Sequence, residues 1–282
     1  MNKMRKFVIT AAGKGNRLLP LTKETPKEML PIYSKSSKGE PILKPILHVI
    51  FDSAFDAGYR DFCFIVGRGK RSVEDHFLVS EGEKNEFIKN SEMQEFFSKL
   101  KKCNITYVQQ STPRGFGDAV MRAKSFVGQD YFLLHAGDDA ILSNRSTHLK
   151  RLEKAFFKHK AKIAFFVTRM EDPRNYGVIE GKEIEKNIFK VSNFQEKPKK
   201  PKSNLATIGI YLFHPSIFDI LTKIRPDKKG EIQLADALKK AIQLNQKTIA
   251  VELEKNEKRV DVGTPENYVE CLGDSYLFYN KR

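Results

Sequence analysis

The segment that most constrains this chain is a glycine-rich loop that follows an apolar, β-branched run near the N-terminus. It reads Val8-Ile9-Thr10-Ala11-Ala12-Gly13-Lys14-Gly15-Asn16-Arg17 and leads on to Pro26-Lys27-Glu28-Met29-Leu30-Pro31. Small residues let main-chain N–H groups approach an anion closely, and the cations Arg17 and Lys27 add positive charge. The segment therefore predicts a strand followed by a phosphate loop, with nucleotide contacts from Ala11, Ala12, Gly13 and Gly15.

Two better-known glycine loops do not fit this segment. A dinucleotide fingerprint needs a third glycine three residues after Gly15, where this chain has Leu18. A Walker loop needs Gly-Lys followed by Ser or Thr at the start of a helix, and the three prolines at 20, 26 and 31 oppose a helix here. An ordinary strand-to-helix turn with unrelated lysines is the alternative. We expect a long ordered loop with a function, because loops of this length usually have one.

Length and composition fit one enzyme domain over residues 1–282. With 40% hydrophobic residues the chain can bury a full core. It has no apolar run long enough to cross a membrane and no apolar signal segment at its N-terminus, so we expect a soluble, cytoplasmic protein without a membrane partner. Cysteines at positions 63, 103 and 271 lack metal-ligand spacing, which argues against a zinc site or a disulfide framework.

The net charge of +15 could suggest a nucleic-acid-binding protein. The basic runs are scattered, however, and no nucleic-acid-binding signature accompanies them. We therefore expect small polyanionic substrates and no nucleic-acid partner. A nucleic-acid-binding protein stays an alternative that the charge alone supports.

Strand and helix patterns alternate along the chain, which predicts an α/β fold with a mostly parallel sheet flanked by helices. We expect strands near residues 7–11, 61–66, 105–109, 131–135, 162–168, 205–213 and 248–253. Helices are expected near residues 46–57, 83–102, 117–127, 146–159, 231–245 and 265–279, the last one capped by Thr264. The polar stretch from Ser34 to Glu40 predicts a surface loop, either inert or a lid near the phosphates.

Ligands of such a sheet belong at the carboxyl ends of its strands, and polar residues stand there. Gln110 ends one strand, and its amide offers a donor and an acceptor to a pyrimidine edge near Gly115. Asp138 and Asp139 follow a buried strand, as acids that hold a divalent metal often do. Asp261 precedes the final helix, where a capping residue is the more frequent reading.

Together these motifs resemble the sugar-1-phosphate nucleotidyltransferases, most closely the bacterial and archaeal UTP–glucose-1-phosphate uridylyltransferases. The resemblance extends from Phe7 to about Tyr268. It implies a single Rossmann-like, glycosyltransferase-A-like sheet with a smaller sugar-binding β extension. The nucleotide-binding half would cover about residues 1–140 and the sugar-binding half about residues 141–282.

The resemblance also implies roles for individual residues. Asp138, together with Arg17 and Lys27, would be catalytic; Asp138 and Asp261 would hold Mg²⁺; and Gln110 and Gly115 would read the base. Sugar-phosphate contacts would come from Tyr176, Gly177, Glu196 and Lys197, in the segments Asn175-Tyr176-Gly177-Val178 and Gln195-Glu196-Lys197-Pro198. The chain departs from the family pattern at Asn16, where threonine is usual, and at Asp118, where the uridylyltransferases often have histidine.

The implied reaction transfers a nucleotidyl group, UMP from UTP, to a sugar 1-phosphate such as glucose 1-phosphate. A sugar phosphate with a second pKa of about 6 is already ionised at neutral pH, so no general base is needed. The alternatives are a thymidylyltransferase that uses dTTP and a homologue that binds sugar nucleotides without turnover. A homo-oligomer, either a dimer or a tetramer, is expected.

Overall fold

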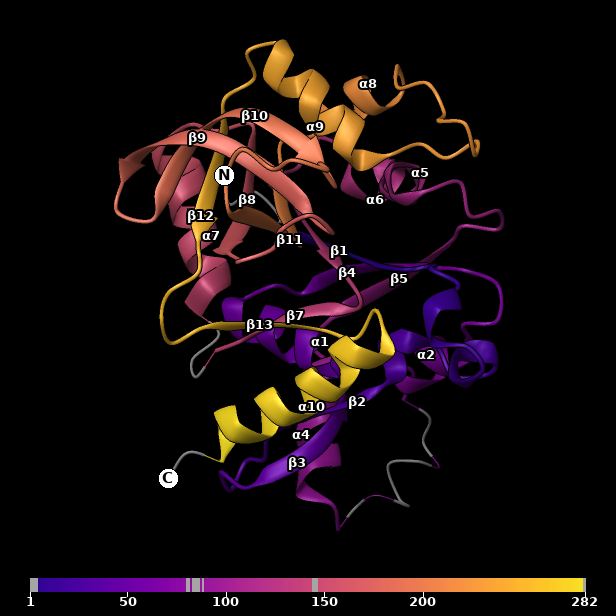
Figure 1. Ribbon diagram of the computed structural model, residues 1–282. Coiled ribbons are helices and arrows are strands. Elements are labelled where there is room, and N and C mark those ends of the chain that lie inside the picture. The colour runs from indigo at the N-terminus through magenta and orange to yellow at the C-terminus, as the bar shows by residue number, and fades with distance from the viewer. Residues whose placement is uncertain (1–4, 80–81, 83–86, 88, 144–146, 281–282) are drawn as a thin grey trace.

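A nine-stranded sheet forms the centre of the computed structural model, which describes residues 5–79, 82, 87, 89–143 and 147–280 (Figure 1). Across the sheet the strands follow the order β5-β4-β1-β6-β11-β8-β12-β10-β9. Their bounds are β1 Lys6–Ala11, β4 Asp61–Val66, β5 Asn104–Gln109, β6 Phe132–Ala136, β8 Ile163–Arg169, β9 Gly177–Glu185, β10 Ile188–Glu196, β11 Leu205–Phe213 and β12 Thr248–Glu252.

The sheet is mixed and mostly parallel. β5, β4, β1 and β6 pair in parallel, as do β8 and β12, whereas β11 and β10 run opposite to their neighbours. The α/β fold is therefore confirmed, and each predicted strand exists within about two residues of its expected bounds. The antiparallel ribbon of β9 and β10 lies at one edge, in the half of the chain that was expected to bind the sugar.

Helices cover both faces of this sheet and bury two apolar clusters against it. One cluster includes buried residues of α1 (Ile46–Ala57), α2 (Arg71–His76), α4 (Ser91–Leu100), α7 (Thr147–Lys158) and α10 (Pro265–Tyr279). The other includes buried residues of α5 (Phe116–Arg122), α6 (Lys124–Val127), α8 (Ile217–Leu221) and α9 (Leu234–Gln243), which gather above the sheet in Figure 1.

Three helices differ from their expected bounds. The helix expected over 117–127 is divided at Ala123 into α5 and α6. The helix expected from Glu231 starts at Leu234, because Ile232 is paired through its main chain with Arg114 and Gly117. α4 starts at Ser91 with Asn90 as its cap, and the residues 83–86 and 88 of that prediction lie outside the described part of the chain.

The surface loop expected from Ser34 to Glu40 is the tip of a hairpin: residues 36–40 form an irregular surface turn, as predicted, whereas Ser34 and Lys35 belong to a strand. β2 (Pro31–Lys35) pairs with β3 (Pro41–Pro45), and only the turn between them is irregular. At the tip, the main-chain N–H of Ser37 donates a 2.7 Å hydrogen bond to Glu92 of α4. Tyr33 packs edge-on against Tyr276 of α10. These contacts attach the hairpin to α4 and α10 rather than to the phosphate loop, which argues against a lid.

A second small ladder reaches the carboxyl edge of the central sheet. β7 (Asp139–Leu142) pairs antiparallel with β13 (Lys258–Asp261), and Asp139 stands opposite Asp261. α10 follows at once, capped by Thr264, whose hydroxyl accepts a 3.2 Å hydrogen bond from the Asn267 N–H. Within the described ranges, no helix combines the length and apolarity that crossing a membrane requires.

Candidate active site

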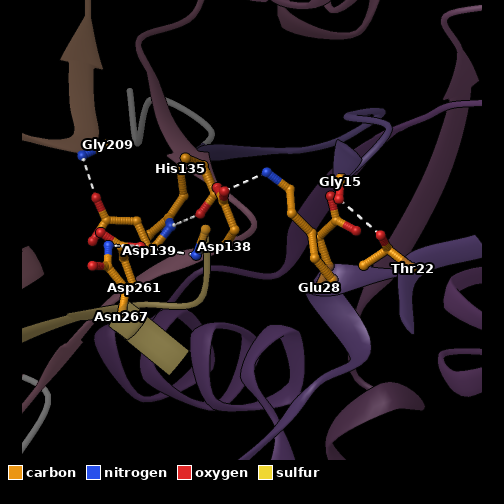
Figure 2. Close-up of polar contacts among 12 residues, drawn as sticks. Gly15, Thr22, Glu28, His135, Asp138, Asp139, Gly209, Asp261 and Asn267 are labelled. Carbon is orange, nitrogen blue, oxygen red and sulfur yellow. Dashed lines mark hydrogen bonds and ion pairs between the residues drawn. The ribbon is translucent and has the colours of Figure 1, made fainter. Parts of the chain in front are cut away.

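The phosphate loop starts where β1 ends and contains only single-turn 3₁₀ helices: η1 (Asn16–Leu18), η2 (Leu21–Lys23) and η3 (Lys27–Met29). Gly15 takes a left-handed conformation with φ of 67°, which glycine adopts without strain. Its carbonyl accepts a 2.7 Å hydrogen bond from the Thr22 hydroxyl (Figure 2). The long ordered loop predicted from the sequence is confirmed.

Lys27 forms an ion pair with Asp138, which β6 delivers at its carboxyl end. Burial opposes the charge of both groups, but each counteracts that cost in the other. The pKa of Lys27 therefore lies above its usual value and that of Asp138 below. Both side chains are charged at neutral pH, and the pair places a cation directly beside the carboxylate.

A second, fully buried ion pair lies behind Lys27. The Nζ atom of Lys70 is 2.7 Å from Oε2 of Glu28, and burial raises the pKa of Glu28 despite this partner. The sequence analysis missed this pair. The available signal was the glycine-containing turn Gly67-Arg68-Gly69 before Lys70, which follows β4 at the same edge of the sheet.

Two adjoining cavities open at this edge. The first, about 610 Å³, is lined by the phosphate loop and by Gln110 and Gly115. The second, about 750 Å³, is lined by Tyr176, Lys197 and Asp261. Arg17, Ala136 and Asp138 belong to both linings. The structure thus brings the residues predicted for the nucleotide and those predicted for the sugar phosphate to opposite sides of Asp138.

Four of the predicted residues do not line either cavity. Ala11 and Gly15 each lie between two residues that line the first cavity, and Gly177 starts β9 beside Tyr176. Glu196 ends β10 opposite Gly177 in the ladder and is exposed, with its carboxylate 3.7 Å from the Lys197 ammonium group. Lys197 itself lines the second cavity in a left-handed conformation, φ 44°, which strains a non-glycine residue.

Arg259 is a central residue of the second cavity that the sequence analysis passed over. Its guanidinium group contacts both oxygens of Asp139 at 2.9 to 3.0 Å and one oxygen of Asp261 at 2.9 Å. It also lies 4.7 Å from the ring centre of Tyr176. Burial raises the pKa of Asp139 to about 6 although Arg259 opposes that shift. Arg259 therefore joins β7, β13 and the predicted sugar-binding segment.

Asp261 does not cap α10, because Thr264 does. Its Oδ1 atom accepts hydrogen bonds of 2.8 Å from the Gly263 N–H and from the Asn267 side chain. Figure 2 shows Asp138, Asp139, Asp261 and Asn267 gathered in one place. A Cβ atom built on Gly263 would lie 3.1 Å from Asp261 and 4.0 Å from Asp138, so the glycine leaves space that both carboxylates face.

These two carboxylates fit a hard cation that takes few protein ligands. Magnesium is commonly bound by one or two carboxylates together with substrate phosphates and water. Within the part of the chain that the structure describes, no group of three or more His, Cys, Asp or Glu side chains is placed to hold a metal. A metal here would therefore depend on Asp138, Asp261 and oxygen atoms from the substrates.

Known nucleotidyl transferases resemble this chain over nearly its whole length. The family model "Nucleotidyl transferase" matches residues 6–275. A UTP–glucose-1-phosphate uridylyltransferase of Streptococcus pyogenes is 39% identical over 280 residues, covering 93% of this chain and 86% of the relative. One of Pseudomonas aeruginosa is 34% identical over 281 residues, covering 97% and 96%.

Solved structures agree with these relatives. A UDP-glucose pyrophosphorylase in complex with UDP-glucose superimposes with a TM-score of 0.83 at 32% identity, covering 99% of this chain and 100% of that chain. An apo UDP-glucose pyrophosphorylase gives a TM-score of 0.86 at 31% identity, covering 97% and 98%. Because the family model matches nearly all of its length and relatives of 34% and 39% identity cover almost the whole chain, the chain belongs to the nucleotidyl transferase family.

Proposed function

We propose that this enzyme transfers UMP from UTP to glucose 1-phosphate, forming UDP-glucose and pyrophosphate. The observation that carries the proposal is the pair of cavities that share Asp138 and Arg17. A nucleotide in the first cavity and a sugar phosphate in the second would meet at these residues. The names of the sequence relatives and structural neighbours supply the identity of both substrates.

Asp138 and Asp261 are proposed to hold Mg²⁺, which would neutralise phosphate charge as the substrates approach each other. The space beside Gly263 and the oxygen-only donor set support this assignment. Asp138 is already deprotonated at neutral pH because Lys27 lowers its pKa, as a ligand of a hard cation must be.

The remaining chemistry follows from charge. The obstacle is repulsion between two anions, which for unit charges ~4 Å apart costs about 4 kcal/mol at an effective dielectric of about 20. Lys27 and Arg17 are proposed to stabilise the nucleotide phosphates, and Lys197 the sugar phosphate. Positioning and electrostatics of this kind account for most of phosphoryl-transfer catalysis.

No side-chain base is assigned to the attack, since the sugar phosphate oxygen is ionised without one. His135, the histidine of β6 next to the site, is buried, and burial lowers its pKa to about 4. Its Nδ1 atom lies 2.7 Å from the Ala136 carbonyl oxygen and donates to it. We therefore assign it to the fold and not to catalysis.

Two alternatives differ in what they predict. A thymidylyltransferase would use dTTP in the same site. A homologue that only binds sugar nucleotides would not need both carboxylates of the predicted metal pair, Asp138 and Asp261, and their presence argues against it. A homo-oligomeric state, a cytoplasmic location and the division into nucleotide- and sugar-binding halves stay predictions.

Pyrophosphate release tests the proposal directly. UTP, dTTP, CTP, ATP and GTP are each combined with glucose, galactose, mannose and N-acetylglucosamine 1-phosphates. We expect UTP with glucose 1-phosphate to give the highest kcat/KM and dTTP to be the strongest competitor. Binding without pyrophosphate release would favour the non-catalytic alternative, and a preference for a purine nucleotide would contradict the assignment. A steep salt dependence of DNA or RNA binding would favour the nucleic-acid alternative.

A further inference from the structure

The side-chain amide of Gln110 is held in one orientation by two acceptors. Gln110 follows β5 and is buried, 4% exposed. Its Nε2 atom donates to Oδ2 of Asp118 at 2.8 Å and to the Gly115 carbonyl oxygen at 3.2 Å. A carboxylate and a carbonyl oxygen can only accept, so the amide group cannot be reversed without placing its oxygen against two others.

Asp118 is itself fixed in place. It lies in the first turn of α5 and is buried, and its second oxygen is 3.4 Å from the guanidinium group of Arg122 one turn later. The start of α5 is attached to the segment before α9, because the Gly117 N–H donates a 2.8 Å hydrogen bond to the Ile232 carbonyl oxygen. The carboxylate that orients Gln110 therefore has little freedom to move away.

Because Nε2 is engaged by Asp118 and Gly115, Oε1 is the polar atom of the Gln110 side chain that remains to bind a ligand. Among the described residues, both hydrogen bonds of the Gln110 side chain come from Nε2 and neither involves Oε1, and Gln110 lines the first cavity together with Gly115. A group that meets this atom gains a hydrogen bond only if it carries a hydrogen. Uracil and thymine have a hydrogen on N3, between two carbonyl groups, whereas N3 of cytosine is an acceptor.

We propose that Asp118 is a positioning residue that makes Gln110 an acceptor toward the base, so that pyrimidines with an N3–H are selected over cytosine. The inference rests on the proposed function, because it places the base of the nucleotide in the first cavity. It also assigns a role to Asp118, the position at which the uridylyltransferases often have histidine. Cytosine is then disfavoured because its N3 and the Oε1 atom of Gln110 are both acceptors, and a buried acceptor without a hydrogen-bond donor costs free energy.

Asp118→Asn tests the orientation, since it keeps the volume but adds a donor to the site. The introduced amide can present its NH₂ group to Gln110, so the Gly115 carbonyl is the one remaining fixed acceptor and the reversed orientation of the Gln110 amide becomes less costly. We expect the ratio of kcat/KM for UTP to that for CTP to fall about tenfold. The ratio for UTP to dTTP should not change, because both bases carry the same N3–H.

Arg122→Gln is the matched control. Arg122 is partly exposed and contacts only the other oxygen of Asp118, at 3.4 Å. Burial of Asp118 and the hydrogen bond of Gly117 to Ile232 still hold the carboxylate, so the Gln110 amide keeps its orientation and the UTP to CTP ratio should stay at the wild-type value. Asp118→Ala is the second variant, for use if Asp118→Asn does not fold, and it should lower the same ratio. UTP methylated at N3 probes the wild type, which should use it far less well than UTP.

The outcomes separate the two proposals. An unchanged UTP to CTP ratio in a folded Asp118→Asn variant of an enzyme that prefers UTP overturns the role of Asp118 alone. An equal loss with UTP, dTTP and CTP overturns it too, because it indicates a purely structural role. A wild type that prefers ATP or GTP contradicts the proposed function and, with it, the inference.

Discussion

The main-chain N–H of Val262 donates a 3.0 Å hydrogen bond to the carbonyl oxygen of Asp138. This bond continues the ladder of β7 and β13 by one step and attaches the segment before α10 to the end of β6. Asp261 is thereby placed beside Asp138 by the backbone and not by its side chain. Substitutions of either carboxylate should leave that placement intact.

Asp138→Asn and Asp261→Asn should each keep the fold, with Asp138→Asn the less stable because Lys27 loses its partner, and each should lose turnover by about two to three orders of magnitude, because a neutral amide holds a hard cation poorly. If both act on one ion, the double variant should be far less than additive in activation free energy. Steady-state kinetics over a Mg²⁺ titration measures this, and thermal unfolding serves as the control. Near-wild-type turnover of Asp261→Asn would show that the second ligand is misassigned, and Asp139 would be tested next.

Arg259→Met should destabilise the protein by about 3–5 kcal/mol, because it leaves the buried carboxylate of Asp139 and the partly buried carboxylate of Asp261 without their cation. Adding Asp139→Asn to this variant removes one of the two unpaired negative charges and should restore part of the stability. Urea unfolding of both variants gives the free energies. Equal stability of the single and double variants would contradict the role assigned to the ion pair of Arg259 and Asp139.

Lys70→Met should leave Glu28 unpaired in the interior, so that its carboxylate competes with Asp138 for Lys27. We expect kcat to fall, together with a loss of about 3–5 kcal/mol of stability. The double variant Glu28→Gln/Lys70→Met removes both charges and should recover most of the stability and some of the activity. A double variant no better than the single one would indicate that packing, not charge, explains the loss.

Lys197→Gly and Lys197→Ala separate the strained backbone from the charge at this position. Both should raise the KM for glucose 1-phosphate, since both remove the ammonium group that lines the second cavity. Only glycine relieves the positive φ of 44°, so Lys197→Gly should be about 1 kcal/mol more stable than Lys197→Ala. Thermal unfolding and initial rates test the two expectations. An unchanged KM in both variants would remove Lys197 from the sugar-phosphate site.

His48 and His76 should make the protein sensitive to acid. Their rings meet at 3.2 Å, and burial lowers the pKa of His48 to about 3 and that of His76 to about 4, although Asp52 opposes both shifts. In the unfolded chain these histidines have an ordinary pKa of ~6.5, so on acidification they bind protons in the unfolded state before the folded one. The free energy of unfolding is therefore unaffected by them above pH ~6.5 and decreases as the pH drops toward 4.

His76→Gln measures this contribution. It should lower the slope of unfolding free energy against pH, between pH 6.5 and 4, by up to about 1.4 kcal/mol per pH unit. Denaturant unfolding at several pH values gives the slope. The same slope in the variant and the wild type would show that His76 contributes nothing to acid sensitivity.

Seven strands of the central sheet could be predicted because they are mostly apolar and rich in β-branched and aromatic residues, as in Asp61–Val66 and Leu205–Phe213, whereas β9 and β10 were not predicted. The short ladder of β7 and β13 could not be predicted either. Each strand has only four residues, and its partner is far away in sequence. Polar residues such as Asp139 and Arg259 also interrupt the apolar pattern of the two strands. The strands β2 and β3 of the hairpin were not predicted, because prolines stand at their ends and proline is typical of loops.

For the site, the strand-end rule located Asp138 and Gln110, and the structure brings Asp138 together with Lys27 and Asp261. What the sequence could not indicate were the roles of residues defined by their partners. Arg259 matters because of Asp139 and Tyr176, Lys70 because of Glu28, and Asp118 because of Gln110. Such pairings depend on tertiary contacts that no local pattern encodes. The catalytic and binding roles themselves stay predictions.

If Asp138 and Asp261 hold the metal as proposed, the hydrogen bond between Val262 and Asp138 makes completion of the active site a late event in the synthesis of the chain. The phosphate loop, Gln110 and Asp138 all leave the ribosome long before Asp261 does. A nascent or truncated chain that ends before β13 would carry the lining of the nucleotide cavity but only one of the two carboxylates. Such a chain should bind nucleotide without turning it over, so that transfer begins only when the last strand closes the ladder.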